Sequence, residues 1–162
     1  MTRRPLVPDD VDVPSELVTA DFRLVPLGPC HNASDHAAWT SSINHIRATP
    51  GFEGRSWPPE GGMSLAQNLA DLENHATEFA ERVAFTYTVL APTTGEVIGC
   101  VYLKPPHEKP PHEKPPHGQG VDVEVLSWVR ADRAHLDTPL YRAVRTWLDT
   151  AWPFTAVEYA AR

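Results

Sequence analysis

Residues 84–103 read AFTYTVLAPTTGEVIGCVYL, two runs of β-branched and aromatic residues joined by a turn. The first run, AFTYTVL at 84–90, and the second, VIGCVYL at 97–103, each have the length and composition of a strand. The glycine-containing turn between them favours an antiparallel hairpin. We expect this hairpin to form the central strands of the sheet.

Beyond the hairpin, the chain predicts a strand, a helix and another strand in succession. VDVEVLSWV at 121–129 alternates apolar and polar residues at its start, as a half-buried strand does. An amphipathic helix is expected over 138–151, with Pro153 just after its end. TAVEY at 155–159 again has the character of a strand. A hairpin followed by a strand–helix–strand unit implies a mixed sheet with helices packed against it.

The clearest helix lies before the hairpin. Apolar residues recur at helical spacing over 65–83, and Ser64 with Gln67 has the S-x-x-Q spacing of a capping box. In a capping box, the two side chains bond to backbone amides that the first turn of a helix leaves without partners. The helix is therefore expected to begin directly after Ser64.

The N-terminal part predicts less regular structure. A short strand is expected over 22–27, and a first helix over 34–48 with Ser34 as its N-cap. Residues 1–21 are rich in proline and aspartate and are expected to be loosely ordered. The remaining residues, 22–162, are then expected to form a single domain, which suits a chain of 162 residues.

Charge and composition exclude several classes of protein. The formal net charge is −7, so neither nucleic acid nor an anionic membrane is an expected partner. No apolar run is long enough to span a membrane, and the N-terminus does not have the pattern of a secretory signal, so a cytoplasmic protein is expected. Cys30 and Cys100 have no metal-ligand spacing and cannot form a disulfide framework.

A low-complexity insert occupies residues 104–120, which read KPPHEKPPHEKPPHGQG. Its diproline steps favour an extended polyproline II loop exposed to solvent. Histidine and glutamate are possible metal ligands, but a five-residue step in polyproline II spans about 15 Å, so the side chains do not converge. No metal site is therefore predicted at the candidate ligands, which are His107, Glu108, His112, Glu113 and His117.

The order of elements resembles that of the GNAT superfamily of N-acetyltransferases. FTYTVL and EVIGCVYL resemble its central hairpin, VEVLSWV and LYRAVRTWLDTAWPF resemble its fourth strand and third helix, and TAVEYAAR resembles its fifth strand. The resemblance implies an α/β (α+β) fold, in which helices flank a mixed, mostly antiparallel central sheet. It also implies transfer of an acetyl group from acetyl-CoA to a primary amine on a small molecule or peptide, by direct attack within a ternary complex.

The resemblance also implies a cofactor site where the fourth and fifth strands separate. The pantetheine arm would pair with backbone at Ser127, Trp128 and Val129. The pyrophosphate would bind amides at the start of the next helix, in a loop of pattern Q/R-x-x-G-x-G/A, because such amides and the helix dipole favour anions. The residues at that loop are Arg133, Ala134, His135, Leu136, Asp137 and Thr138.

This loop departs from the family pattern. Leu136 and Thr138 stand where the family has glycine and glycine or alanine. Asp137 is placed to cap the helix itself, where its carboxylate would repel a phosphate. An alternative function is therefore a GNAT-like dimeric module that binds a small ligand or a partner and has lost acetyl-CoA binding.

Single residues carry further expectations from the resemblance. Glu124 would be the general base, or else a strand residue that faces solvent. His135 could lie near an anion or be an exposed loop residue, and Trp57 lies in a loop that often shapes the acceptor site in the family. A full GNAT domain continues with another helix and two strands, whereas this sequence stops at Arg162. The edge of the last strand is therefore expected to pair with a second chain in a homodimer.

Overall fold

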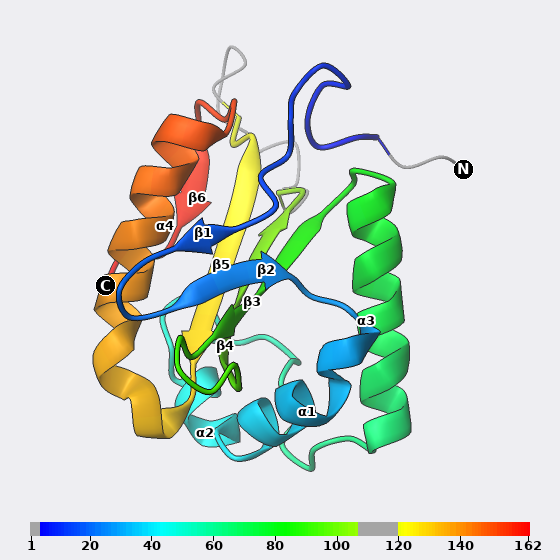
Figure 1. Ribbon diagram of the computed structural model, residues 1–162, viewed down its shortest axis with the longest axis vertical. Helices are drawn as coiled ribbons and strands as arrows, with labels where there is room; N and C mark the ends of the chain where they lie inside the picture. The colour runs from blue at the N-terminus through cyan, green and yellow to red at the C-terminus, as the bar shows by residue number, and fades with distance from the viewer. Residues whose placement is uncertain (1–3, 107–119) are drawn as a thin grey trace.

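The computed structural model describes residues 4–106 and 120–162, and its centre is one six-stranded sheet (Figure 1). The strands follow one another across the sheet in sequence order, and each neighbouring pair is antiparallel except β5 and β6, which are parallel. This confirms the predicted mixed, mostly antiparallel sheet. The strands are Leu17–Val18 (β1), Arg23–Pro26 (β2), Phe85–Leu90 (β3), Val97–Lys104 (β4), Val123–Val129 (β5) and Val157–Tyr159 (β6).

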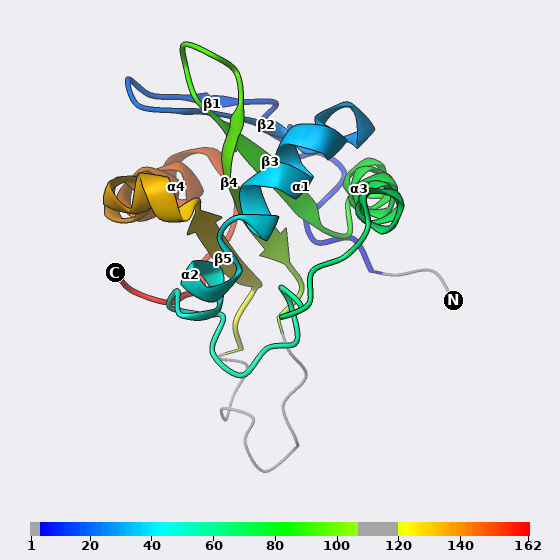
Figure 2. The ribbon, with the colours of Figure 1, turned by 90° about the horizontal axis from the view of Figure 1, so that it is seen from below.

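Helices cover both faces of this sheet. Figure 2 shows α4 on one face, with α1 and α3 on the other. Side chains alternate along β5, so that Val125 packs with the helix α4 while Leu126 packs with the opposite helices. The helices are Asn32–Thr40 (α1), Ile43–Arg47 (α2), Leu65–Ala80 (α3) and Asp137–Ala151 (α4), with short 3-10 segments at Pro29–His31 (η1) and Ala131–Leu136 (η3).

The capping box predicted before α3 is confirmed. The backbone N–H of Gln67 donates to Ser64 Oγ over 3.1 Å, and the Gln67 side chain accepts from the backbone N–H of Ser64 over 2.9 Å. Both bonds satisfy amides at the helix start, so α3 begins at Leu65 as expected. This fixes the position of a helix that lines the cavity described below.

The single helix predicted over 34–48 is wrong, because the structure divides it into α1 and α2. Thr40 Oγ1 donates to the carbonyl of His36, and Ser41 Oγ donates to that of Ala38, a pattern that bends helices. Ser34 does not cap the helix. Its hydroxyl accepts from the backbone N–H of Val97 over 2.9 Å and so ties α1 to β4.

The last strand is shorter than the predicted 155–159. Asp122 Oδ2 accepts hydrogen bonds from the backbone N–H and the hydroxyl of Thr155, at 2.8 and 2.7 Å, and from the N–H of Ala156 at 3.1 Å. Those amides therefore bond to a side chain rather than to the backbone of β5. Strand β6 begins only at Val157.

The N-terminal residues make specific contacts with the sheet and with α3. Val7 is buried in the core shared with α4, and the backbone N–H of Leu6 donates to the carbonyl of Arg82. The Tyr87 hydroxyl donates to the carbonyl of Pro14 over 2.6 Å. The composition of this segment did not predict these contacts, because they depend on partners about 70 residues away.

Two further predictions concern the low-complexity insert and the pairing of the last strand. Of the insert predicted over 104–120, residues 107–119 with the candidate metal ligands lie outside the described residues, whereas Lys104 is the last residue of β4 and not part of an exposed loop. Strand β6 is the last strand of the sheet among the described residues, and its pairing with a second chain stays a prediction. None of the helices in residues 4–106 and 120–162 has the length and apolar character needed to cross a membrane.

Candidate functional site

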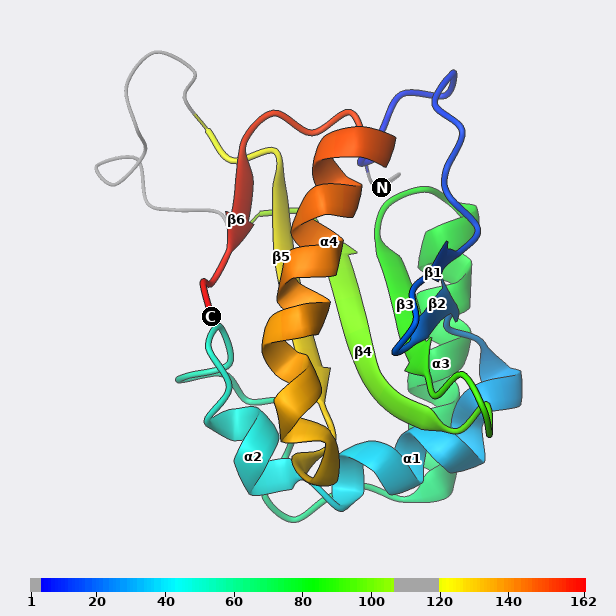
Figure 3. The ribbon, with the colours of Figure 1, turned by 60° about the vertical axis from the view of Figure 1, so that its left-hand side comes forward.

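Strands β5 and β6 separate after a short region of pairing (Figure 3). The three residues of β6 pair with β5, and the last pair joins Val125 to Tyr159. Strand β5 continues to Val129. The residues predicted to hold pantetheine, Ser127, Trp128 and Val129, therefore lie beyond the last pair, at the point where the two strands separate.

The side chain of Arg162 fills this position. It is 2% exposed, and its Nη2 donates to the carbonyl and the hydroxyl oxygen of Ser127 at 2.8 and 3.2 Å. Nη1 donates to the carbonyls of Ala160 and Pro50, at 2.8 and 3.3 Å. The Nε of the same guanidinium donates to Asp137 Oδ2 over 2.6 Å. Every nitrogen of the group is thus hydrogen-bonded, which offsets the cost of burying its charge.

Two tyrosine rings, with centroids 4.6 Å apart, pack against each other and beside the guanidinium. The rings of Tyr141 and Tyr159 each have their centroid 5.8 Å from Arg162 Cζ, within the range of cation–π attraction. The hydroxyls of Tyr159 and Ser127 lie 2.5 Å apart. Burial raises the pKa of Tyr159 to about 12, so the phenol keeps its proton at neutral pH. These groups complete a closed cluster between β5, β6 and α4.

The start of α4 also differs from the prediction. Asp137 was expected to cap the helix, but it is the first helical residue, and Leu136 occupies the N-cap position without a side-chain cap bond. The carboxylate of Asp137 binds the buried guanidinium instead, since a cation is a stronger partner than a backbone amide. The preceding loop forms η3, in which Ala134 and His135 are exposed.

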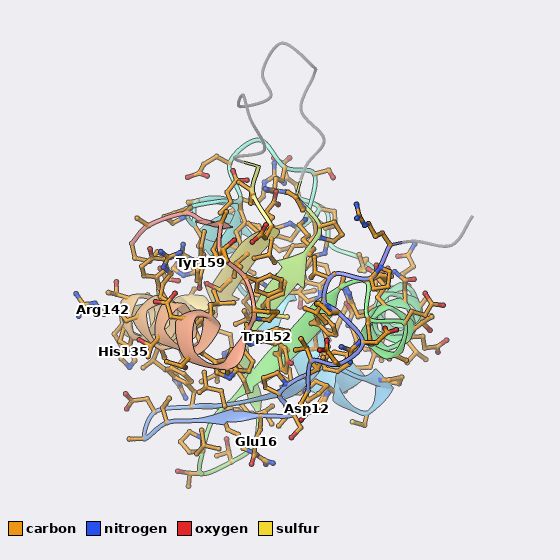
Figure 4. The ribbon with its side chains drawn as sticks, turned by 90° about the horizontal axis from the view of Figure 1, so that it is seen from above. Asp12, Glu16, His135, Arg142, Trp152 and Tyr159 are labelled. Carbon is orange, nitrogen blue, oxygen red and sulfur yellow. The ribbon has the colours of Figure 1, made fainter. Side chains whose placement is uncertain are left out.

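Two other loop residues, Arg133 and His135, take no part in the cluster around Arg162. Arg133 Nη2 lies 3.4 Å from Glu96 Oε1. His135 lies on the outer side of α4 with Arg142, whereas Tyr159 lies on the inner side (Figure 4). Acetyl-CoA would need the Ser127 backbone and the amides at the start of α4. The Ser127 carbonyl is bonded to Arg162, and the amides at the start of α4 lie beside the carboxylate of Asp137. The residues in this arrangement therefore do not fit the cofactor.

A cavity of about 760 Å³ opens on the opposite face of the sheet, between α3, β4 and the segment 52–57. Glu124 lies beside it. The solvent-facing alternative for this residue is wrong, since Glu124 is 2% exposed. Its Oε1 lies 2.8 Å from Arg55 Nη2 and 3.6 Å from Lys104 Nζ. Both cations line the cavity, so the buried carboxylate is balanced there by two positive charges.

Helix α3 contributes acidic residues to the lining of the cavity. Asn68, Asp71, His75 and Glu78 are spaced along one face of α3, and all four line the cavity. Asp35 of α1 lies behind them, and its Oδ2 accepts from Asn68 Nδ2 over 3.1 Å. Burial, together with the charge of Asp71, raises the pKa of Asp35 to about 6, although the bond from Asn68 opposes this.

His75 joins α3 to the sheet. Its Nδ1 lies 3.2 Å from Thr86 Oγ1 and 3.4 Å from Glu78 Oε1. Burial lowers the pKa of the imidazole and outweighs the opposing effect of Glu78, which favours the neutral ring at neutral pH. The ring centroid lies 6.0 Å from that of Tyr102, the residue that continues the lining toward β4.

Aromatic rings form the middle of the cavity. Trp57, which was expected to shape an acceptor site, lines it together with Phe52 and Tyr102. The Trp57 ring packs against those of Tyr102 and Trp128, with centroids 6.1 and 6.2 Å away. Part of the cavity lining is therefore apolar and aromatic.

A short segment separates this cavity from the cluster around Arg162. Gly51 has φ +99, and a Cβ built on it would lie 2.9 Å from Leu126 Cδ2 and 3.6 Å from Ala160 Cβ. The carbonyl before it, on Pro50, accepts from Arg162, while its own carbonyl accepts from Arg55 Nε. Only a residue without a side chain fits here, and it forms part of the wall between the two sites.

The sequence singled out Glu124 and Trp57, which lie beside and in the lining of the cavity, but not its other polar residues. The spacing of Asn68, Asp71, His75 and Glu78 at i, i+3, i+7 and i+10 was the available signal for a polar face on α3. Arg55 and Arg162 gave no such signal, because their partners are 69 and 25 residues away in the sequence. In the part of the chain that the structure describes, histidine, cysteine and carboxylate side chains form no group of three suited to a metal.

Comparison with known proteins identifies the fold. No protein-family model matches this sequence, and no curated protein matches it. Solved structures do match: a ribosomal-protein-S5-alanine acetyltransferase from Vibrio fischeri has a TM-score of 0.59 at 13% identity, over 86% of this chain and 69% of its own. A GCN5-related N-acetyltransferase from Brucella melitensis has a TM-score of 0.54 at 17% identity, over 93% and 60%.

A third structure is similar to the same extent. RimL, a ribosomal L7/L12 alpha-N-protein acetyltransferase in complex with coenzyme A, has a TM-score of 0.55 at 12% identity, over 82% of this chain and 66% of its own. The chain therefore spans 60–69% of the length of these three proteins. At this level of identity the comparison establishes the fold, which is that of the GNAT acetyltransferases.

Proposed function

We propose that this protein uses the GNAT fold to bind a small molecule in the cavity between α3 and β4, without acetyl-CoA. One observation carries the proposal: the buried side chain of Arg162 occupies the position where the cofactor would pair with β5, while the cavity on the other face is open. The cavity volume of about 760 Å³ is within the range of small-molecule sites.

Two further features support this proposal. The loop before α4 has Leu136 and Thr138 where close approach of a phosphate calls for small residues, and Asp137 adds a negative charge. Displacing Arg162 would leave that carboxylate without its cationic partner, which costs about 3–5 kcal/mol for a buried pair. An incoming cofactor would have to offset this cost before it gained any affinity.

An acetyl-CoA-dependent N-acetyltransferase acting on a primary amine is the second candidate. It is favoured by the likeness to acetyltransferases and by the buried Glu124 at the cavity, the residue assigned as the base. In this candidate Ser127 to Val129 and the loop 133–138 would hold the cofactor once Arg162 had moved. The Gly51 segment between the two sites would also have to shift.

Thermal unfolding separates the two candidates, because a ligand that binds only the native state raises Tm. For the cofactor-free binding protein we expect the same Tm with and without millimolar acetyl-CoA, and no release of free coenzyme A when primary amines are added. A clear rise in Tm with acetyl-CoA, followed by amine-dependent release of coenzyme A, would replace the first candidate with the second.

A further inference from the structure

Asp35 is a buried carboxylate in the lining of the cavity. It belongs to α1 and is 4% exposed. Among the described residues, a single hydrogen bond reaches this carboxylate, from Asn68 Nδ2 to Oδ2 over 3.1 Å. Buried carboxylates usually accept several hydrogen bonds, because each oxygen has two acceptor sites. The other oxygen, Oδ1, is therefore available to a donor that enters the cavity.

The side chain of Asn68 holds this carboxylate in place. Its Nδ2 donates to Asp35 Oδ2 and also to Asn32 Oδ1, the second bond over 2.9 Å, and its Oδ1 accepts from Trp39 Nε1 over 2.9 Å. Both hydrogens of the amide are thus in use, and the side chain is bonded to three residues of α1. The carboxylate is therefore fixed before a ligand arrives, which lowers the entropic cost of binding.

Charge favours a cationic donor over a neutral one. Burial raises the pKa of Asp35 to about 6, an effect that the bond from Asn68 and the charge of His36 oppose and the charge of Asp71 increases. The carboxylate is therefore mostly ionised at neutral pH. Asp71 lies one turn after Asn68 on α3 and lines the same cavity. A cation beside Asp35 would offset both the burial of its charge and the repulsion from Asp71.

Apolar residues of α3 and of the segment after β2 also line the cavity. Leu72 and Leu27 are buried there and pack in the same core as the apolar residues of α1. The cationic side chains of the lining, Arg55 and Lys104, contact the carboxylate on β5 described above, and neither alters the pKa of Asp35. A ligand bound at Asp35 would therefore combine an apolar body with one charged group.

We propose that the cavity binds a small organic cation, whose ammonium or amidinium group donates a hydrogen bond to Asp35 Oδ1 and whose apolar body lies against Leu27 and Leu72. The contact places the cation on α1 rather than at the separation of β5 and β6, where an acetyl acceptor would have to lie, so the group is bound and not acetylated. This inference rests on the proposed function only in using the same cavity. A rise in Tm with acetyl-CoA would overturn the proposed function without affecting this contact.

Three small molecules with the same phenylethyl body test the proposal by calorimetry on the full chain at neutral pH. 2-Phenylethylamine has a cationic donor, 2-phenylethanol a neutral donor, and 3-phenylpropionate an anionic group. We expect the amine to bind about tenfold more tightly than the alcohol, which is the effect of one charge-assisted hydrogen bond, and the acid to bind more weakly than both. Equal affinities of amine and alcohol, tighter binding of the acid, or no binding of the amine at millimolar concentration would overturn the inference.

A substitution of Asp35 assigns the contact. Asp35→Asn should lower the affinity for the amine about tenfold, to that of the alcohol, and leave the alcohol unchanged, because only the charge is removed. The matched control, Glu73→Gln, removes an exposed carboxylate of α3 that does not line the cavity, and it should change neither affinity. If Asp35→Asn kept the preference for the amine, or weakened amine and alcohol equally, the carboxylate would not bind the cation and the inference would be wrong.

Discussion

Arg162 and Asp137 form an ion pair with Nε and Oδ2 2.6 Å apart, although the residues are 25 positions apart in the sequence. The pair joins the segment after β6 to the first residue of α4. Because the guanidinium also bonds to Ser127, it connects three elements at the place where β5 extends past its last pair with β6. The proposed absence of cofactor binding rests on this contact.

Replacing Arg162 tests the energy of this cluster. Arg162→Met should lower the free energy of unfolding by about 3–5 kcal/mol, because it leaves the carboxylate of Asp137 without its cation. Arg162→Lys should lower it less, since a cation remains but the fixed set of donors is lost. Urea unfolding measures both values. Adding Asp137→Asn to Arg162→Met should recover part of the loss, because the unpaired charge is then removed.

The matched control for this prediction is an exposed arginine of α4. Arg142→Met should change the free energy of unfolding by no more than about 0.5 kcal/mol, as is usual for surface positions. If Arg142→Met and Arg162→Met had equal effects, the cluster would contribute nothing specific to stability.

Asp35 should make stability depend on pH in the acid range. Its pKa is raised from 3.8 to about 6 in the folded protein, chiefly by burial, so the folded state holds this proton more tightly than the unfolded state. Stability should therefore fall as pH rises from about 4 to about 6. Asp35→Asn removes this cost and should be more stable than the natural protein by up to about 3 kcal/mol above pH 6, and nearly equal to it below pH 4.

Urea unfolding of Asp35→Asn and of the natural protein across this pH range checks whether the stability of the natural protein falls as pH rises. Glu73→Gln, on an exposed position of α3, should reproduce the natural profile. A stability difference between Asp35→Asn and the natural protein that does not change with pH would show that the carboxyl does not titrate as described.

The wall between the two sites depends on Gly51. Gly51→Ala places a methyl group on a residue with φ +99, 2.9 Å from Leu126 Cδ2, so both backbone strain and a steric clash are expected. Gly54→Ala is the matched control, since Gly54 has φ +75 and no heavy atom within 4 Å of the added group. We expect Gly54→Ala to lower the free energy of unfolding by about 1 kcal/mol, and Gly51→Ala to lower it by at least twice as much. If thermal unfolding showed that both variants lose the same stability, the residues around Gly51 would have room for the added methyl group.

The elements that sequence reasoning placed correctly are those specified by nearby residues. The hairpin of β3 and β4 depends on two apolar runs and the turn between them, and α3 depends on its apolar stripe and on Ser64 with Gln67. In each case the partners lie within the element or directly beside it. Local pattern and tertiary structure therefore agree.

The features that were missed depend on contacts between distant parts of the chain. Ser34 binds the backbone of Val97, and Asp122 takes the amides that would have begun β6 earlier. The charge of Arg162 gives no hint that the side chain is buried, because arginine is usually exposed. For the same reason, the sequence pointed to Glu124 but not to its partners Arg55 and Lys104, nor to the acidic residues of α3 that line the cavity.

The Nε–H of Arg162 reports most directly on whether the space between β5 and β6 is closed. Its nuclear magnetic resonance signal, assigned by its loss in Arg162→Lys, should exchange slowly with water because the group is buried and bonded to Asp137. We predict that the signal keeps its position and its slow exchange when acetyl-CoA is added to millimolar concentration. A shift of the signal on adding acetyl-CoA, with loss of its protection from exchange, would show that the cofactor displaces Arg162 and would contradict this account.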